Sequence, residues 1–270
     1  MVAPKEIQSK YEEVVPGVYS LVPNDIYHST DGLSKTNLCD IYESISLYNM
    51  KKNKTEKPTD PMIKGSALHD LCLLPDVFKE TYVVGPTINR STKKWKEFVK
   101  EHPDKVILTP GMSEDIFLMR DALYGNPRIR EILESKTVLR EVSIWVKDPF
   151  TGLIVKVRPD IILDGVIYDI KTTIAPHSRA FLHSVYKYNY FVQSALYQDV
   201  SRINGMQISN FVFLVVGSTP PYLTAIYDLN DELVQEGRDK YREALITYSN
   251  YLMSDDGWDG LSYGREVVTL

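Results

Sequence analysis

Cysteine is scarce in this 270-residue sequence, which contains only Cys39 and Cys72. Two cysteines are too few for an iron–sulfur cluster, and too few for a zinc site built from cysteine alone. They do not provide a disulfide framework either. We therefore expect the protein to work in a reducing compartment, the cytoplasm.

Long apolar runs are also lacking. The longest, "FVFLVVG" at 211–217, has the length of a strand, whereas a helix that crosses a bilayer needs ~20 apolar residues. The opening residues, "MVAPKEIQSKYEE", contain no hydrophobic segment of the signal-peptide type. The sequence therefore predicts no membrane partner.

The sequence also lacks an excess of positive charge. The formal net charge of −5 argues against a protein that coats nucleic acid with its whole surface. It does not exclude a basic groove on an acidic body, because the local field controls encounter. Lysine is concentrated in "KKNKTEK" at 51–57 and "KKWKEFVK" at 93–100, and a solvated loop or helix face is the favoured interpretation of each.

Helical spacing of apolar residues dominates the first half of the chain. Helices are predicted over 32–52, 62–75, 94–103, 113–127 and 126–135, with Ser34 and Ser113 as N-cap residues and a linker at 53–61.

The pattern then changes to the two-residue period of strands. Strands are predicted over 137–148, 153–163 and 166–173 as an antiparallel meander, then over 209–218 and 222–229, with helices over 178–204 and 231–254. This order predicts an α/β fold, a mixed β-sheet flanked by helices. We expect a single domain over 1–270, with a mainly helical N-terminal part (1–135), the sheet and its crossover helix (136–230), and a closing helix and tail (231–270).

One strand pair carries charges inside its apolar runs: "RPDIILDGVIYDIKTT", residues 158–173. Asp164-Gly165 between two β-branched runs predicts a two-residue type I′ turn. In that register Asp160 faces Asp169, and Arg158 faces Lys171. Pro159 weakens the register, because proline cannot donate a ladder hydrogen bond and is typical of bulges and edges.

Two carboxylates opposite each other would destabilise the sheet unless something offsets their repulsion. A divalent cation between Asp160 and Asp169 would do so, and oxygen ligands suit Mg²⁺ or Mn²⁺. The alternative is a pair of structural carboxylates neutralised by Arg158 and Lys171. With a metal bound, the two aspartates and Lys171 are suited to phosphodiester hydrolysis, since the lysine can orient a water or balance developing charge.

These residues resemble the PD-(D/E)xK nuclease superfamily, with Pro159-Asp160 as the first element and Asp169-Ile170-Lys171 as the second. The wider sequence is similar to RecE-type (exonuclease VIII-like) exonucleases over about residues 25–220. The similarity lies in "GLSKTNLCDI", "GSALHDLCLLPDVF", "RPDIILDGVIYDIKTT", "YFVQSALYQD" and "FVFLVVGST", which follow in the same order and approximate spacing. Ending the second element in "KTT", and having His69 rather than Glu on the preceding helix, also resembles RecE more than its relatives.

The resemblance implies a PD-(D/E)xK restriction-endonuclease-like core and a 5′-to-3′ exonuclease on linear double-stranded DNA. Such an enzyme uses one or two Mg²⁺ ions, for which Mn²⁺ substitutes, and leaves a 3′-ended single strand for recombination by strand annealing. It also implies a RecT-like annealing protein as partner, a homo-oligomeric ring, and a phage or prophage gene expressed in a bacterial cytoplasm.

Carried over by position, the resemblance assigns the metal ligands and the catalytic lysine. His69, Asp160 and Asp169 would be metal ligands, the carbonyl of Ile170 would complete the metal shell, and Lys171 would be catalytic. A histidine on a short helix is, without this context, usually a surface or core residue.

Other positions around these residues are candidates for holding DNA. Gln193 and Tyr197, four residues apart on one helix face, would position Lys171 or a phosphate, or would be the polar seam of a packed helix. Ser34 and Lys35 begin a helix whose N-terminus could bind a 5′-phosphate, against plain capping. Arg158 and Thr172 flank the ligands and would contact phosphate or only support the sheet. Glu141 is a further acidic candidate, although a solvated strand residue is the favoured interpretation.

Two rival interpretations remain open. One is another nuclease on the same fold, either an endonuclease or a Cas4-like enzyme. The latter usually carries four cysteines for an iron–sulfur cluster, which this chain does not have. The other is a catalytically silent DNA-binding scaffold, whose signature would be loss of an acidic ligand or of the lysine.

Overall fold

The computed structural model describes residues 5–6, 15–52, 54 and 57–254. Three residues of the predicted linker (53, 55 and 56) and the predicted tail (255–270) lie outside this part of the chain.

A five-stranded mixed sheet forms the centre of the molecule. Its strands, in spatial order, are β11 (Thr224–Asp228), β10 (Asn210–Gly217), β9 (Val166–Thr173), β8 (Ile161–Leu163) and β5 (Leu139–Arg140). β9 and β10 are parallel and the other neighbours are antiparallel. The parallel pair requires a crossover, which α9 (Ser178–Lys187) and α10 (Tyr190–Ile203) provide.

A second sheet of four strands continues from the first. It contains β1 (Lys5–Glu6), β2 (Gly17–Ser20), β6 (Ser143–Lys147) and β7 (Ile154–Val157). A separate parallel pair consists of β3 (Tyr82–Val84) and β4 (Val106–Leu108).

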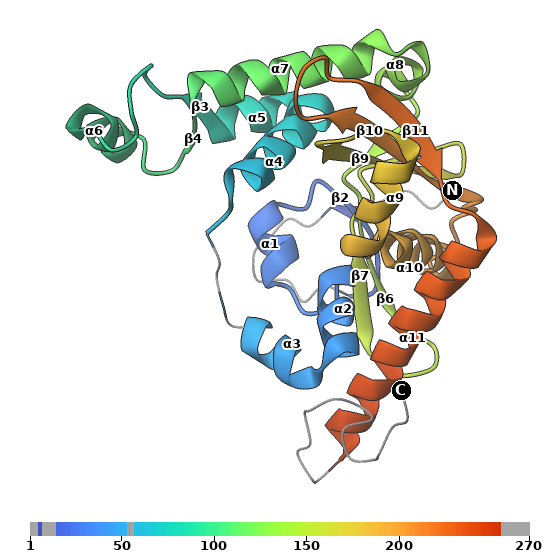
Figure 1. Cartoon of the computed structure of the whole chain (residues 1–270). Helices are drawn as coiled ribbons and strands as arrows, with labels where there is room; N and C mark the ends of the chain where they lie inside the picture. Colours follow the sequence, from blue (N-terminus) through green and yellow to red (C-terminus); the bar gives the residue numbers. More distant parts are fainter. Residues whose placement is uncertain (1–4, 7–14, 53, 55–56, 255–270) are drawn as a thin grey trace.

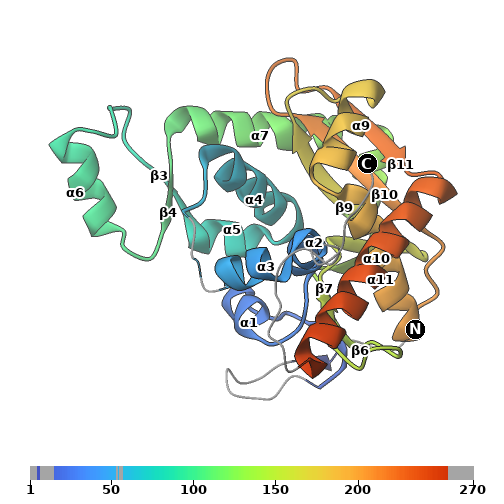
Figure 2. The same cartoon turned by 60° about the horizontal axis from the view of Figure 1, so that its bottom comes forward.

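Helices cover both faces of the central sheet (Figures 1 and 2). The remaining helices are α1 (Asn24–Ser29), α2 (Lys35–Glu43), α3 (Ile45–Lys52), α4 (Asp60–Leu73), α5 (Pro75–Thr81), α6 (Lys93–Glu101), α7 (Pro110–Gly125), α8 (Pro127–Glu134) and α11 (Asp231–Met253). Alternate residues of β10 enter different cores. Leu214 and Val216 pack with α4, α7 and α8, whereas Phe213 and Val215 pack with α2, α10 and α11. The two-residue period of a strand buried on both faces thus produces three layers, and the predicted α/β class is confirmed.

The predicted turn at Asp164-Gly165 is present. Leu163 pairs with Val166, and both turn residues have positive φ, 48° at Asp164 and 78° at Gly165, as a type I′ turn requires. A β-carbon on Gly165 would lie 2.7 Å from the carbonyl oxygen of Gln207, so this position needs glycine for space as well as for its backbone angle.

The predicted three-stranded meander is wrong. The segment 153–163 is two strands, β7 and β8, which lie in different sheets and are separated by Arg158–Asp160. Pro159 has no N–H for a ladder bond, so the strand breaks there. The segment 137–148 also divides into β5 and β6, at Glu141, whose φ is 48°. Each of these two segments passes from one sheet to the other. The two passages lie side by side and are joined by a hydrogen bond from the Glu141 N–H to the Asp160 carbonyl at 3.0 Å.

Three helical predictions also need correction. The segment 178–204 bends at Asn189 (φ 52°), and 32–52 divides at Ser44. Ser113 is not an N-cap: α7 begins three residues earlier, with Thr109 accepting from the Met112 N–H at 3.2 Å. Ser113 itself is buried in the helix. The Ser34 cap is confirmed.

The segment from β3 to β4 carries α6 away from the rest of the molecule (Figures 1 and 2). Its anchor is Trp95, which is 6% exposed and lies so close to Gly85 that a β-carbon there would be 2.6 Å from the indole. The lysines face outward, and the Lys93 side chain is 91% exposed. Within the described residues, no helix is both long enough and apolar enough to cross a membrane.

Candidate active site

Helix α4 places His69 over strand β9. The two elements run close together, since a β-carbon at Gly65 would already contact Thr172 Oγ1 at 3.6 Å. One turn later, His69 Nε2 lies 2.8 Å from the carbonyl oxygen of Ile170, and Nδ1 lies 3.2 Å from Oδ2 of Asp160. If Nε2 donates to the carbonyl, Nδ1 can face the carboxyl oxygen only with a proton or a cation between them. The structure therefore brings together His69, Asp160 and the Ile170 carbonyl.

Asp160 lies one residue beyond the end of the β8–β9 ladder, whose last pair is Ile161 with Tyr168. Its Oδ2 accepts the Ile170 N–H at 2.8 Å. Burial raises the pKa of Asp160 to about 6; His69 opposes this shift and the negative charge of Asp169 adds to it. The carboxylate is thus held inside the protein without full compensation of its charge.

Glu141 completes the acidic cluster. Ligand atoms of His69, Glu141 and Asp160 all lie within 4.8 Å of one another. Burial, and then repulsion from Asp160, raise the pKa of Glu141 to about 8. The prediction that Glu141 is a solvated strand residue is therefore wrong. The left-handed bend at Glu141, between strands of two different sheets, turns its side chain toward Asp160, and no local pattern could have indicated this bend.

Asp169 and Lys171 are two residues apart on β9, so their side chains share a face, and they form an ion pair through Asp169 Oδ2. Asp169 is 1% exposed, and its Oδ1 accepts from the Gln193 amide at 2.5 Å. Burial would lower the pKa of Lys171, but Asp169 and then Asp160 outweigh burial and raise it. Lys171 is therefore a charged ammonium group at the edge of the cluster, with its side chain 17% exposed.

Three other predicted site residues, on α10 and β9, make contacts of different kinds. Gln193 contacts Asp169 and not Lys171. Tyr197 lies on the same helix, with its ring edge-on to Phe211 at 6.0 Å. Thr172 pairs in the sheet with Val216.

Arg158 does not face Lys171, because the chain leaves the strand there. Its guanidinium group donates to Ser143 Oγ at 2.8 Å and the Val22 carbonyl at 3.1 Å, and lies 4.0 Å from the centroid of the Tyr27 ring. The predicted neutralisation of the aspartates by Arg158 is therefore wrong.

The N-terminus of α2 lies near the Asp169–Lys171 ion pair. Ser34 and Asn37 cap it reciprocally, with Ser34 N–H donating to Asn37 Oδ1 at 2.9 Å. Lys35 Nζ donates to the Tyr188 carbonyl and lies 5.9 Å from the centroid of the Tyr190 ring. Burial lowers the pKa of Lys35; of its charged neighbours, Lys171 lowers it too, whereas Asp169 raises it. The sequence missed Tyr190, whose ring centroid is 4.9 Å from Lys171 Nζ.

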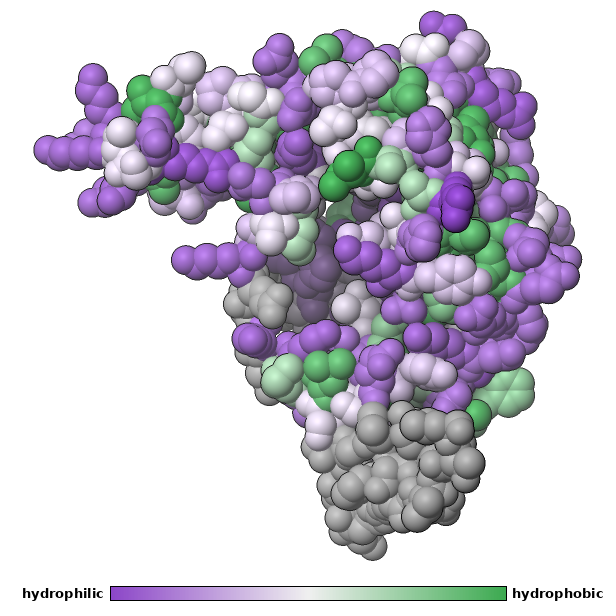
Figure 3. Space-filling view, in the orientation of Figure 1, coloured by the Kyte–Doolittle hydropathy of each residue, from purple (hydrophilic) through white to green (hydrophobic). Residues whose placement is uncertain are grey.

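The cluster is suited to a divalent cation. It offers two carboxylates, an imidazole nitrogen and a backbone carbonyl, and its carboxyl pKa values are raised where a cation would lower them. The His69 side chain is 25% exposed, so the cluster is open to solvent on the side of His69. Figure 3 shows a hollow with a largely hydrophilic wall between the upper layer, which contains α4, and the lower helices α1–α3.

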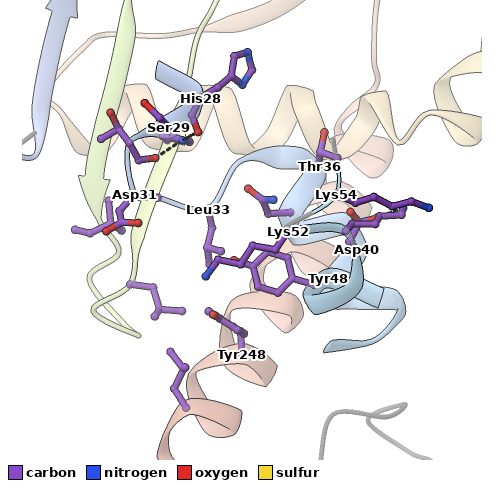
Figure 4. A pocket seen from close by; sticks show the side chains of 18 residues that line it. His28, Ser29, Asp31, Leu33, Thr36, Asp40, Tyr48, Lys52, Lys54 and Tyr248 are labelled. Carbon is purple, nitrogen blue, oxygen red and sulfur yellow. Dashed lines mark hydrogen bonds and ion pairs between the residues drawn. The ribbon is translucent and has the colours of Figure 1, made fainter. Parts of the chain in front are cut away.

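A separate pocket of about 940 Å³ lies between the α1–α2 loop, α3 and α11 (Figure 4). None of the predicted site residues lines it. Two of its lysines are held by the protein itself: Lys51 pairs with Asp40 at 2.7 Å, and Lys156 donates to the carbonyls of Tyr27 at 2.7 Å and Thr30 at 2.5 Å. This pocket is distinct from the acidic cluster.

Residues 35–257 match the family described as a PDDEXK-like domain of unknown function (DUF3799). The chain belongs to this family. It is thus a member of the PD-(D/E)xK nuclease superfamily, and the matched region contains all the residues of the cluster.

Among solved structures, the chain is similar to a protein from Eubacterium rectale described as a candidate exonuclease. The TM-score is 0.58 at 14% identity, with 92% of this chain and 95% of that chain covered, which shows a shared fold. A crystal structure of SSO0001 gives a TM-score of 0.27 at 17% identity, covering 68% of this chain and 88% of that chain, and this score is too low to indicate a shared fold. No curated protein matches the sequence.

Proposed function

We propose that this protein is a Mg²⁺-dependent exonuclease that degrades linear double-stranded DNA from 5′ to 3′ and leaves a 3′-ended single strand. The observation that carries the proposal is the acidic cluster of His69, Glu141 and Asp160 beside the Asp169–Lys171 ion pair. Superfamily membership supports hydrolysis of a nucleic-acid phosphodiester. The similarity to RecE-type sequences supports the direction and the substrate.

In this proposal His69, Asp160, Asp169 and the Ile170 carbonyl hold the metal, with Glu141 as an additional acidic ligand. A bound divalent cation would polarise the scissile phosphate and lower the pKa of a water. Mn²⁺ would substitute for Mg²⁺, since both prefer oxygen ligands.

The protein's own groups would supply the rest of the chemistry. Lys171, kept charged by Asp169, balances the negative charge that develops on the phosphate and orients the attacking water. The Gln193 side-chain amide donates a hydrogen bond to Asp169 and fixes it, and so positions the lysine indirectly. Ser34 and Lys35, at the N-terminus of α2, would hold the terminal 5′-phosphate. Tyr197, Arg158 and Thr172 are assigned positioning roles around the ligands.

The biological setting follows from the same similarity. We propose a single nuclease domain that assembles into a homo-oligomeric ring around the duplex, in the cytoplasm of a bacterium that carries the phage or prophage gene. The 3′-ended product would pass to a RecT-like annealing protein for recombination.

The test compares linear with closed-circular duplex DNA, in Mg²⁺ and in EDTA, for wild type and Asp160→Ala. We expect wild type with Mg²⁺ to degrade linear DNA only, releasing a 5′ label before a 3′ label. Asp160→Ala and EDTA should both abolish the reaction. Cutting of the circle would indicate an endonuclease instead, and binding without hydrolysis a silent scaffold. Undiminished digestion by Asp160→Ala would refute the assignment of the centre.

A further inference from the structure

A group of tyrosines leads from the proposed centre to the surface at the break between α9 and α10. The Tyr190 ring lies near two cations, with its centroid 4.9 Å from Lys171 Nζ and 5.9 Å from Lys35 Nζ. The Tyr188 ring lies against it, with centroids 5.6 Å apart and planes tilted by 31°. Tyr188 is 47% exposed, so this aromatic path begins at the catalytic lysine and ends in solvent.

The backbone fixes Tyr188 in this place although its ring is open to solvent. The Tyr188 N–H donates to the Ser184 carbonyl at 3.0 Å, and its own carbonyl accepts from Lys35. The next residue, Asn189, has a left-handed backbone with φ 52°, and its side chain accepts from Lys240 Nζ at 3.1 Å. A tyrosine on a fixed backbone offers a large contact area and loses little conformational entropy on binding.

Exposure of one tyrosine would need no explanation on a soluble protein. The surroundings of Tyr188 are what distinguish it. Lys187 Nζ lies 5.2 Å from the centroid of its ring, and Lys35 is bonded to its backbone. Stacking surfaces flanked by cations are how proteins hold unpaired nucleotides, since rings take the bases and cations the phosphates.

We infer that Tyr188, supported by Tyr190, is a stacking platform for an unpaired base at the end of the DNA strand that enters the centre. This inference rests on the proposed function and deepens it. Two ring contacts of 4.9 and 5.6 Å separate Lys171 from Tyr188. That reach corresponds to a few base steps of ~3.4 Å along a strand. Since every base has a π-face, the platform accepts all four bases and favours frayed ends over paired ones.

The test is a double-mutant cycle between protein and DNA, measured as the Kd by fluorescence anisotropy in Ca²⁺. One arm compares wild type with Tyr188→Ala. The other compares intact duplex ends with ends that carry one abasic site at each of the last four nucleotides in turn. Tyr188→Ala should weaken binding about 5- to 100-fold. One abasic position should weaken wild-type binding as much, and should cost the variant little more.

Two matched variants keep a structural effect apart from stacking. Tyr188→Trp retains an aromatic face and should bind as well as wild type. Phe150→Ala removes another exposed ring, 80% exposed in the turn between β6 and β7, and should leave the Kd unchanged.

The outcomes separate this inference from the proposed function. If wild type neither binds nor cuts DNA, the proposed function fails, and the platform with it. If wild type cuts DNA but the losses of the ring and of the base add independently, the platform is refuted and the nuclease stands. If no abasic position weakens wild-type binding, the platform is refuted even without a folded variant.

Discussion

The charges of carboxylates are balanced differently in two regions of this protein. Between α10 and α11, Asp199 Oδ2 accepts from Arg238 Nε at 2.6 Å and from the Tyr241 hydroxyl at 2.7 Å. Burial alone would raise the pKa of Asp199, but the hydrogen bonds from Arg238 and Tyr241 outweigh it and lower the pKa. This carboxylate is stabilised in its charged form by its own neighbours.

At the acidic cluster the balance is reversed. Burial and mutual repulsion raise the pKa values of Glu141 and Asp160, so their charges are left to be offset by something outside the fold. The difference distinguishes a structural carboxylate, Asp199, from carboxylates that are available for chemistry. Asp199, whose partners offset its charge, joins α10 to α11, whereas Glu141 and Asp160, whose raised pKa values show incomplete compensation, are candidates for binding a cation.

The largest expected effect is a loss of nuclease activity when the acidic cluster is changed, but not when Asp199 is changed. Asp160→Asn should lower kcat on linear DNA at least ~10³-fold, because several kcal/mol of charge stabilisation depend on the ligand it removes. Asp199→Asn should leave kcat unchanged but lower the free energy of unfolding by about 2–3 kcal/mol, since Arg238 loses its partner. Single-turnover kinetics and urea unfolding measure the two quantities. A similar loss of kcat in both variants would contradict the distinction.

The next effect concerns metal. Mg²⁺ at about 100 times its Kd should raise the free energy of unfolding of wild type by about 2.7 kcal/mol, because it binds the folded state only. Asp199→Asn should gain as much, and Asp160→Asn should gain far less. The measurement is urea unfolding in Mg²⁺ and in EDTA. Equal stabilisation of all three proteins would show that the ion binds elsewhere.

A smaller effect follows from pH. The raised pKa values mean that the folded state retains protons on Glu141 and Asp160 that the unfolded chain has released. Their contribution to stability is therefore present at low pH and is lost as pH rises through about 6 and about 8. In EDTA we expect the free energy of unfolding to fall by about 1 kcal/mol per pH unit across this window.

Glu141→Gln is the matched variant for that measurement. It should flatten the pH dependence and, at pH 8, be more stable than wild type without metal, because it removes the repulsion of Asp160. Asp199→Asn should retain the wild-type slope between pH 6 and 8. A stability that rises over this range would mean that the cluster is already compensated.

The smallest expected change in stability comes from removing an uncharged group, the Ser34 hydroxyl. Ser34→Ala removes the cap of α2 and should cost about 1 kcal/mol. The loss should be the same in Mg²⁺ and EDTA and at pH 6 and 8, since the hydroxyl carries no charge. A loss that appears only with metal would link the cap to the acidic cluster.

Much of the centre could be predicted because it is local in sequence. The Asp164-Gly165 turn fixes the register of β8 and β9, and alternation on β9 places Asp169 and Lys171 together. His69 needed the resemblance, since a helix one hundred residues away gives no local signal of what it packs against.

The remainder depends on tertiary structure. Glu141 joins the cluster only because the chain bends there and passes between two sheets, and Arg158 leaves it for the same reason. The break at Asn189 is equally hidden, because an asparagine inside a helical pattern also reads as an ordinary solvent-facing residue. The positions of Glu141 and Arg158 follow from where the sheets meet, which no window of sequence contains.

The side-by-side crossing of Glu141 and Asp160 between the sheets has a consequence for how the protein is made. The groups of the cluster come from α4, from the bend after β5, and from the hairpin that follows β7, so no single segment contains them. A partly synthesised or partly unfolded copy has the aspartates but not their arrangement. An immature copy therefore lacks the acidic cluster as a unit, which exists only once folding is complete.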